Sequence, residues 1–168
     1  MRDGSRRESA VAQLFSLGGS IHTMQTQEHY EISTDRSRLD IAVIHDFLRS
    51  SYWAKGIPRQ VVEKSIEHSL CFGAYADKRQ VGFARVITDF VCVAYIADLF
   101  VVPEYRQRGI SKLLMHAIIE HSELQGVRGL LLATRDTHGL YAQFGFHALP
   151  HPEHFMTLRK PVIYNDAA

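Results

Sequence analysis

The sequence predicts a single α+β domain of the three-layer α/β type, in which a mixed, mostly antiparallel twisted sheet carries helices on both faces. Two strand-like runs, residues 70–75 and 80–88, are separated only by a short polar turn and therefore predict an antiparallel hairpin. A strand, a helix and another strand follow one another over residues 91–134, and this order predicts a parallel crossover. A chain of 168 residues with 46% hydrophobic and 22% charged residues has the size and composition of one globular domain.

Residues 1–23 differ in composition from the rest of the chain, because they are rich in Gly, Ser and Arg. Their one apolar stretch, residues 11–17, is too short for the core of a signal peptide. We therefore expect a flexible N-terminal extension over residues 1–23 and a single domain over residues 24–168.

Hydrophobic periodicity and helix-capping residues place the remaining elements. Asp40 is suited to cap a first helix, Pro58 to begin a second, and Asp136 to cap a last short one rather than to bind a ligand. Before the hairpin we expect a strand at 30–34 and helices at 40–48 and 59–69. After it we expect a central strand at 91–102, a helix at 111–121 that Gly126 ends, and a strand at 129–134. The chain then continues with a helix at 136–143 and two last strand segments around 150–152.

The charge balance excludes a general attraction to polyanions. Nineteen Lys and Arg face eighteen Asp and Glu, which gives a formal net charge of +1. No field of one sign then draws the whole chain to nucleic acid or to a membrane surface, so neither is expected as a partner. Any anion-binding site must be local.

The Cys and His residues predict no metal site. Cys71 and Cys92 both lie in apolar runs and match no metal-ligand spacing, so we expect inert core thiols. The ten His residues include no HxH or HExxH pair. The lack of a secretory signal or of a run of about 18 apolar residues adds to the expectation of a reducing, cytoplasmic location.

The most informative segment, residues 101–114, joins a buried strand to a helix through a basic turn that contains Gly109. Unpaired N–H groups at a helix start, together with the positive end of the helix dipole, attract anions, and glycine allows close approach to the backbone. Arg106 and Arg108 add positive charge. Neither GxxxxGK[ST] nor GxGxxG is present, which argues against a P-loop or a Rossmann site. The plainer interpretation is a helix start with two solvated arginines.

Two motifs identify the chain as similar to one family. The segment Arg106-Gln107-Arg108-Gly109-Ile110-Ser111 resembles the signature [Q/R]-x-x-G-x-[G/A] of the GNAT N-acetyltransferase superfamily, with its V-x-P-E-Y-R lead-in at 101–106. Residues 140–146, LYAQFGF, are similar to the family's L-Y-x-x-x-G-F element. The resemblance covers residues 72–146 and implies a GNAT-like acyl-CoA N-acyltransferase fold. Ser111 departs from the usual Gly or Ala, and no Asn occurs at residues 134–138, where many members have one.

The resemblance implies acetyl-CoA as the co-substrate. Backbone N–H groups of the turn would hold its pyrophosphate, Phe100 and Val102 would bind pantetheine through their main chain, and a bulge near Asp98 would separate this strand from the one at 129–134. The cofactor-binding residues implied in this way are Phe100, Val101, Val102, Arg106, Gln107, Arg108, Gly109, Ile110, Ser111 and Lys112.

The resemblance also implies that Tyr141 protonates the departing thiolate, since a tyrosine pKa of about 10 lies above the value near 8.5 of a thiol. The alternative role of Tyr141 is a core anchor. Asp98, an acid in an otherwise apolar strand, is the first candidate for the base that deprotonates the amine, ahead of His138 and Glu104. The alternative is that Asp98 faces solvent or is paired structurally.

Tyr52 and Trp53 lie in the loop between the first two helices, where this superfamily builds its acceptor site. They are expected either to line that site or to form a packed hydrophobic lid. The expected function is transfer of acetyl from acetyl-CoA to a primary amine by direct attack in a ternary complex. A small-molecule amine is favoured over a protein amine, and a homodimer is considered as the assembly. The alternative function is a non-catalytic acyl-CoA-binding or sensing module.

Overall fold

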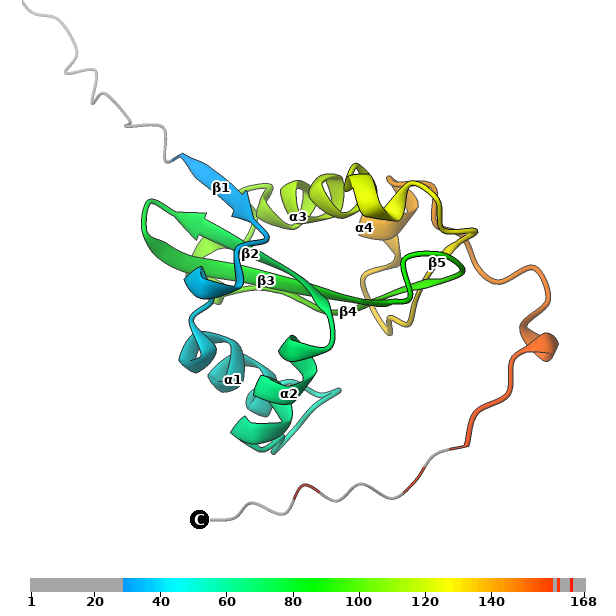
Figure 1. Cartoon of the computed structure of the whole chain (residues 1–168), viewed down its shortest axis with the longest axis horizontal. Helices are drawn as coiled ribbons and strands as arrows, with labels where there is room; N and C mark the ends of the chain where they lie inside the picture. Colours follow the sequence, from blue (N-terminus) through cyan, green and yellow to red (C-terminus); the bar gives the residue numbers. More distant parts are fainter. Residues whose placement is uncertain (1–28, 159, 161–163, 165–168) are drawn as a thin grey trace, which may run out of the picture.

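The structure is a computed structural model that describes residues 29–158, 160 and 164 (Figure 1). The extension expected over residues 1–23 lies outside the described residues. The strands are β1 (Tyr30–Ser33), β2 (Leu70–Ala76), β3 (Arg79–Thr88), β4 (Ala94–Val101) and β5 (Leu130–Leu132), and the helices are α1 (Ile41–Ser50), α2 (Arg59–Glu67), α3 (Ile110–Ile119) and α4 (His138–Ala142).

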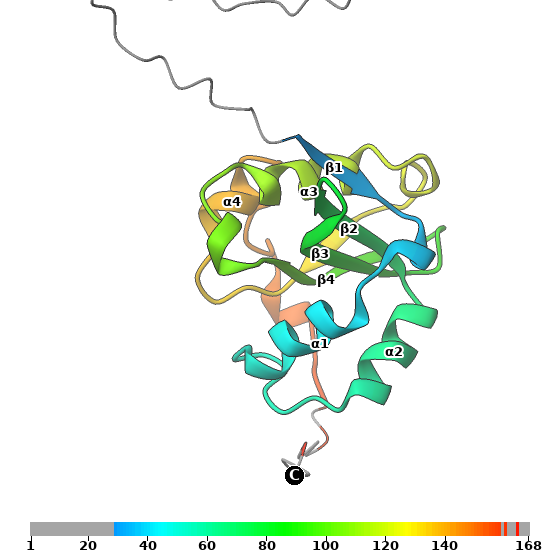
Figure 2. The ribbon, with the colours of Figure 1, turned by 90° about the vertical axis from the view of Figure 1, so that its left-hand side faces the viewer.

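One mixed sheet organises the domain, with its strands in the order β1-β2-β3-β4-β5. The first four strands pair antiparallel, and β5 pairs parallel with β4 after the crossover through α3. Helices α1 and α2 lie below the sheet and α3 and α4 above it in Figures 1 and 2. The predicted α+β class, with a mostly antiparallel sheet and helices on both faces, is confirmed.

Each face of the sheet buries its own hydrophobic core. Alternating side chains of β3 point to opposite faces, so Phe83 packs toward α1 and α2 while Ala84 packs toward α3. On the α3 face the helix contributes four fully buried side chains, Ile110, Leu114, Met115 and Ile118. On the other face the core consists of Ile44, Leu48, Ala54, Val62, Ile66, Cys71, Phe83 and Phe100. These two cores fix the sheet as a rigid base for the site.

A β-bulge interrupts β4. Phe83 of β3 lies opposite Phe100, but Arg85 lies opposite Ala97, so one residue of β3 faces both Asp98 and Leu99. Asp98 adopts a left-handed backbone with φ of 54°. Pairing between β4 and β5 covers only residues 94–96 of β4 and ends before the bulge. The bulge near Asp98 is confirmed, and the separation of the two strands beyond it stays a prediction.

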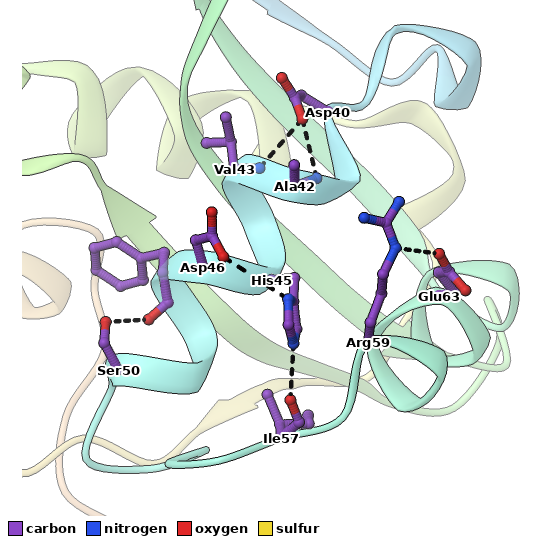
Figure 3. Close-up of polar contacts among 10 residues, drawn as sticks. Asp40, Ala42, Val43, His45, Asp46, Ser50, Ile57, Arg59 and Glu63 are labelled. Atoms are coloured by element: carbon purple, nitrogen blue, oxygen red, sulfur yellow. Dashed lines mark hydrogen bonds and ion pairs between the residues drawn. The ribbon is translucent and has the colours of Figure 1, made fainter. Parts of the chain in front are cut away.

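Helix α1 is capped at its start, and the loop that leads from it to α2 is tied back to the helix (Figure 3). Asp40 caps α1 as predicted, because its side chain accepts hydrogen bonds from the N–H groups of Ala42 and Val43 at 3.0 and 3.2 Å. His45 Nε2 lies 3.0 Å from the Ile57 carbonyl oxygen, and Gly56 donates its N–H to the Arg49 carbonyl. These bonds tie the end of the loop back to α1.

Three predicted boundaries are wrong. The central strand begins at Ala94 rather than at residue 91, because the Asp89 carboxylate accepts the backbone N–H groups of Val91, Cys92 and Val93 and so holds them in a turn. Helix α3 ends at Ile119, ahead of the predicted boundary and well before Gly126, and a 3-10 turn follows. The N-cap of α4 is Thr137, not Asp136, and no side chain caps it.

The two strand segments expected around residues 150–152 are also not found. Among the described residues after β5 the only regular elements are α4 and a 3-10 turn over Pro152–His154. Two prolines, Pro150 and Pro152, lack the N–H that a strand would donate. The segment is exposed, with Met156 and Leu158 98% and 88% accessible.

The two cysteines behave differently. Cys71 is buried in β2 as expected, and burial raises the pKa of its thiol to about 11, which makes it inert. Cys92 is exposed in the turn before β4, so the expectation of a core thiol is wrong there.

Among the helices of the described residues, none is long and apolar enough to cross a membrane.

Candidate active site

The turn before α3 presents unpaired backbone N–H groups. Gly109 is the N-cap of α3 with φ of 81°, and Gln107 also has a left-handed backbone with φ of 61°. Within the described part of the chain, the N–H groups of Gln107, Gly109, Ile110 and Ser111 have no hydrogen-bond partner. A Cβ built on Gly109 would meet nothing within 4 Å, so a ligand can reach this backbone. The turn therefore has the properties of an anion site.

The two arginines of the turn are anchored to the neighbouring backbone. Arg106 Nε donates to the Val101 carbonyl at 3.2 Å, and Arg108 donates to the Glu104 carbonyl at 3.0 Å. The Arg108 guanidinium also lies 4.9 Å from the centre of the Tyr105 ring. These contacts place both guanidinium groups beside the turn.

The main-chain contacts expected at Phe100 and Val102 need correction. The Val102 N–H donates to the Val81 carbonyl of β3 at 2.9 Å and is not free for a cofactor. Backbone polar groups alternate between the two edges of a strand, so Phe100, which pairs with Phe83, also faces β3. The groups that face the gap between β4 and β5 therefore belong to Leu99 and Val101.

Asp98 forms a nearly buried ion pair at the bulge. Its Oδ2 accepts from Arg85 Nε at 2.6 Å, and its Oδ1 accepts from Trp53 Nε1 at 3.1 Å. The Asp98 and Arg85 side chains are 11% and 16% exposed, and Arg85 also donates to the Ser69 hydroxyl. The carboxylate is thus held by α1–α2 loop and β3 residues just beyond the point where β4 and β5 stop pairing.

Tyr141 lies on α4 and is 9% exposed. Burial raises the pKa of its phenol, and a hydrogen bond with the Thr137 side chain opposes this shift. The Thr137 hydroxyl is in turn 2.7 Å from the hydroxyl of Thr134.

Tyr52 and Trp53 bridge β4 and the loop that follows β5. Their rings meet edge to face at 5.0 Å, and Trp53 reaches the bulge through Asp98. The guanidinium of Arg135, on the loop that follows β5, lies 3.8 Å from the centre of the Tyr52 ring. Tyr52 also lies close enough to Tyr141 to affect its pKa. The structure thus brings Tyr52, Trp53, Asp98 and Tyr141 together, whereas Glu104 and His138 are exposed.

Sequence analysis missed three residues of this arrangement. Arg85 carries a detectable signal, because it is a single charge within an apolar strand like Asp98 itself. Leu99 could have been found from strand alternation once the bulge was expected. Arg135 has no sequence signal, since its contact with Tyr52 depends on how two distant loops meet.

Comparison with known proteins gives the family. Residues 32–157 match the model of the acetyltransferase (GNAT) domain. A candidate acetyltransferase of Gibberella zeae is 28% identical over 70% of this chain and 78% of its own length. GCN5-related N-acetyltransferase 1 of Arabidopsis thaliana, a chloroplast protein, is 31% identical over 62% of this chain and 57% of its own length.

A solved structure shows the same relationship. A GNAT-family protein of Xanthomonas campestris pv. campestris is 50% identical, has a TM-score of 0.79, and matches 82% of this chain and 97% of its own. This degree of identity, the match to the family model over most of the chain, and the bulged strand before the glycine turn all agree. The chain belongs to the GNAT acetyltransferase family.

Proposed function

We propose that this protein transfers the acetyl group of acetyl-CoA to a primary amine by direct attack within a ternary complex. The observation that carries the proposal is the combination of unpaired N–H groups before α3 with β4–β5 pairing that ends at Ile96, two residues before Asp98. An acetyltransferase of Clostridium acetobutylicum, solved with acetyl-CoA, shares the fold at 13% identity and a TM-score of 0.57.

The residues present suit coenzyme A. Its pyrophosphate would lie at the N–H groups of residues 107–111, and the side chains of Arg106 and Arg108 would add positive charge. Its pantetheine amides would pair with the main chain of Leu99 and with the N–H of Val101, whose carbonyl already accepts from Arg106 Nε. Bound acetyl-CoA supplies an activated thioester, whose acetyl carbon forms a bond to the amine nitrogen as the carbon–sulfur bond breaks.

Tyr141 is suited to supply a proton to the departing sulfur. Burial raises its phenol pKa, so the group is protonated throughout the neutral range. Because the phenol stays neutral, it can donate a hydrogen bond that stabilises the negative charge developing on sulfur as the carbon–sulfur bond breaks. The Thr137 side chain lies near the phenol and is itself 2.7 Å from the Thr134 hydroxyl.

Asp98 is suited to position the ammonium and to receive its proton. Two of its acceptor sites are taken by Arg85 and Trp53, and a carboxylate has about four. An amine that binds beside it can therefore still donate. The arrangement also supports the structural interpretation, in which Asp98 mainly fixes the bulge and the loop that carries Trp53.

A small-molecule amine remains our proposed acceptor class. The side chains around the gap are Tyr52 and Trp53, both about half exposed, and Arg135. A second, open groove between α2 and β3 is bordered by Lys64, Ser69, Arg85 and Ile87 but not by Asp98 or Tyr141. We therefore place the acceptor at the aromatic pair rather than in that groove.

The test is acetyl-CoA turnover, measured as release of free thiol over a panel of small amines and short peptides, with coenzyme A binding measured by calorimetry. We expect saturable binding and turnover with at least one amine. Binding without turnover on any amine would favour the non-catalytic acyl-CoA module. Absence of binding at millimolar coenzyme A would contradict both functions.

A further inference from the structure

A short turn after α4 gathers three metal-ligating side chains away from the acetyl-transfer site. Residues 152–154 form a 3-10 turn, in which His154 N–H donates to the His151 carbonyl at 3.1 Å. Side chains three residues apart eclipse each other in a 3-10 helix. The rings of His151 and His154 accordingly stack, with centroids 4.9 Å apart and an interplanar angle of 18°.

Glu153 places a carboxylate oxygen between these rings. Its Oε1 lies 3.0 Å from His151 Nδ1 and 3.9 Å from His154 Nε2. The three ligand atoms all lie within 4.8 Å of one another. The three side chains are 64–70% exposed, so an ion can reach them and keep water as a further ligand.

We propose that His151, Glu153 and His154 bind a divalent transition-metal ion, with Zn²⁺ as the ligand to test. Zinc binds imidazole and carboxylate at about 2.0–2.2 Å, which places tetrahedral ligand atoms about 3.3 Å apart. The two observed spacings to Glu153 Oε1 bracket this value. Three protein ligands and one water complete a tetrahedral set, and imidazole with carboxylate suits zinc.

The site would cross-link the turn and have no part in acetyl transfer. None of its three residues contacts Asp98, Tyr141 or the turn before α3 among the described residues. Pro152 fixes the backbone of the turn before the ion arrives, which reduces the ordering that binding requires. The expected consequence is a metal-dependent rise in melting temperature with unchanged turnover.

The experiment uses the full chain without a histidine tag. Calorimetry should show one Zn²⁺ ion bound per chain, and Co²⁺ should give the visible absorption of a low-symmetry site. His151→Ala combined with His154→Ala should weaken Zn²⁺ binding by about 100-fold or more, and Glu153→Gln by about tenfold, on the scale of lost ligand contacts. His116→Ala is the matched control, because His116 also lies 3.9 Å from a carboxylate, that of Glu120, but has no third ligand within the part of the chain that the structure describes.

Two results would overturn the proposal. Equal Zn²⁺ stoichiometry and affinity in the wild type and in the double variant would mean an adventitious ion only, held by other exposed His or Cys residues. Loss of binding in His116→Ala as large as that in the double variant would mean the same. Circular dichroism of each variant establishes that it is folded, which the exposure of all these side chains leads us to expect.

Discussion

The two halves of the candidate site are built from different parts of the polypeptide. The donor half consists of backbone features of residues 98–112: a bulge, three left-handed residues and a set of unpaired N–H groups. The acceptor half consists of side chains from separate segments: Tyr52 and Trp53 after α1, Asp98 at the bulge, and Arg135 after β5. They meet at Tyr141.

This difference explains how much of each half can be predicted from the sequence. A backbone site requires only a few residues with special conformations, such as Gly109, so it leaves a short contiguous motif. A side-chain site depends on distances between loops far apart in the sequence and leaves none. The donor is accordingly identified more readily than the acceptor, and substitutions should act on the two halves to very different degrees.

The largest effect should come from Gly109→Asp. The substitution adds a negative charge where the pyrophosphate would lie, and the left-handed backbone at this residue, φ 81°, disfavours any side chain. We expect coenzyme A affinity to fall by at least about 100-fold, which corresponds to about 2.7 kcal/mol. Calorimetric titration with coenzyme A measures this loss.

The matched control is Gly126→Asp, another glycine with open space around it but without a positive φ. Gly109→Ala separates shape from charge, because it introduces only strain of about 1–2 kcal/mol and no repulsion. Coenzyme A affinity that is equal in Gly109→Asp and Gly126→Asp would remove the donor site from this turn.

Tyr141→Phe, at the junction of the two halves, should give the next largest effect. Loss of the phenolic hydroxyl should lower kcat by about 10²-fold, a typical scale for one positioned acid, while coenzyme A affinity stays the same. Steady-state kinetics and binding on one preparation measure both. Tyr95→Phe, which removes an exposed hydroxyl from β4 ahead of the bulge, is the control.

The pH dependence of kcat gives a second test of the role of Tyr141. Because the folded-state pKa of Tyr141 is raised above its ordinary value of about 10, the phenol should not ionise below that pH. Any stability that depends on the neutral phenol is complete below pH 10 and lost only as pH rises through the folded pKa. A fall in kcat between pH 7 and 9 that persists in Tyr141→Phe would therefore belong to another group.

Local sequence signals predicted most of the fold. The hairpin of β2 and β3, the Asp40 cap and the parallel crossover follow from patterns that span a few residues each. The failures came where a side chain or a proline overrides the apolar pattern. Asp89 captures three N–H groups before β4, and Pro150 and Pro152 lack the N–H groups that a last strand would donate.

The site was predictable to the extent that it is local. Gly109, Asp98 and Tyr141 were singled out from the sequence, but Arg85 and Arg135 were not, because an ion pair across two strands and a contact between two loops have no sequence spacing. The Val102 N–H is bonded to β3, so the main-chain contacts that we propose lie one residue away from those expected at Phe100 and Val102. Along a strand, a shift of one residue replaces the backbone groups that face one neighbouring strand with those that face the other.

Asp98→Asn should have an intermediate effect and decide between base and structural roles. Asparagine tolerates the left-handed backbone at this residue and keeps an acceptor for Trp53, but Arg85 loses its counter-charge. If Asp98 is the base, kcat/KM for the amine should fall about tenfold at neutral pH and recover as pH rises, since free amine becomes more abundant. Rate profiles from pH 6 to 10 measure this.

Asp77→Asn is the control, because Asp77 is an exposed acid with nearly the same left-handed backbone, φ 53° against 54° at Asp98. A uniform loss of rate at every pH, together with a melting temperature lowered only in Asp98→Asn, would assign Asp98 to the ion pair rather than to proton transfer. Removal of one member of a nearly buried pair is expected to cost up to about 3 kcal/mol.

The smallest effect should come from Trp53→Phe, which tests whether the two halves act separately. The substitution keeps an aromatic ring against Tyr52 but deletes the N–H that donates to Asp98 at 3.1 Å. A hydrogen bond of about 1 kcal/mol predicts a rise of about fivefold in KM for the amine, because the loop is less well held. The KM for acetyl-CoA should not change, since the hydrogen bond of Trp53 goes to the Asp98 side chain and not to a backbone group of the donor half. Phe90→Leu, a change at another exposed aromatic residue, should alter neither value. Equal increases of both KM values in Trp53→Phe would show that the aromatic pair supports the whole gap between β4 and β5, and the division into a backbone-built donor half and a side-chain-built acceptor half would then fail.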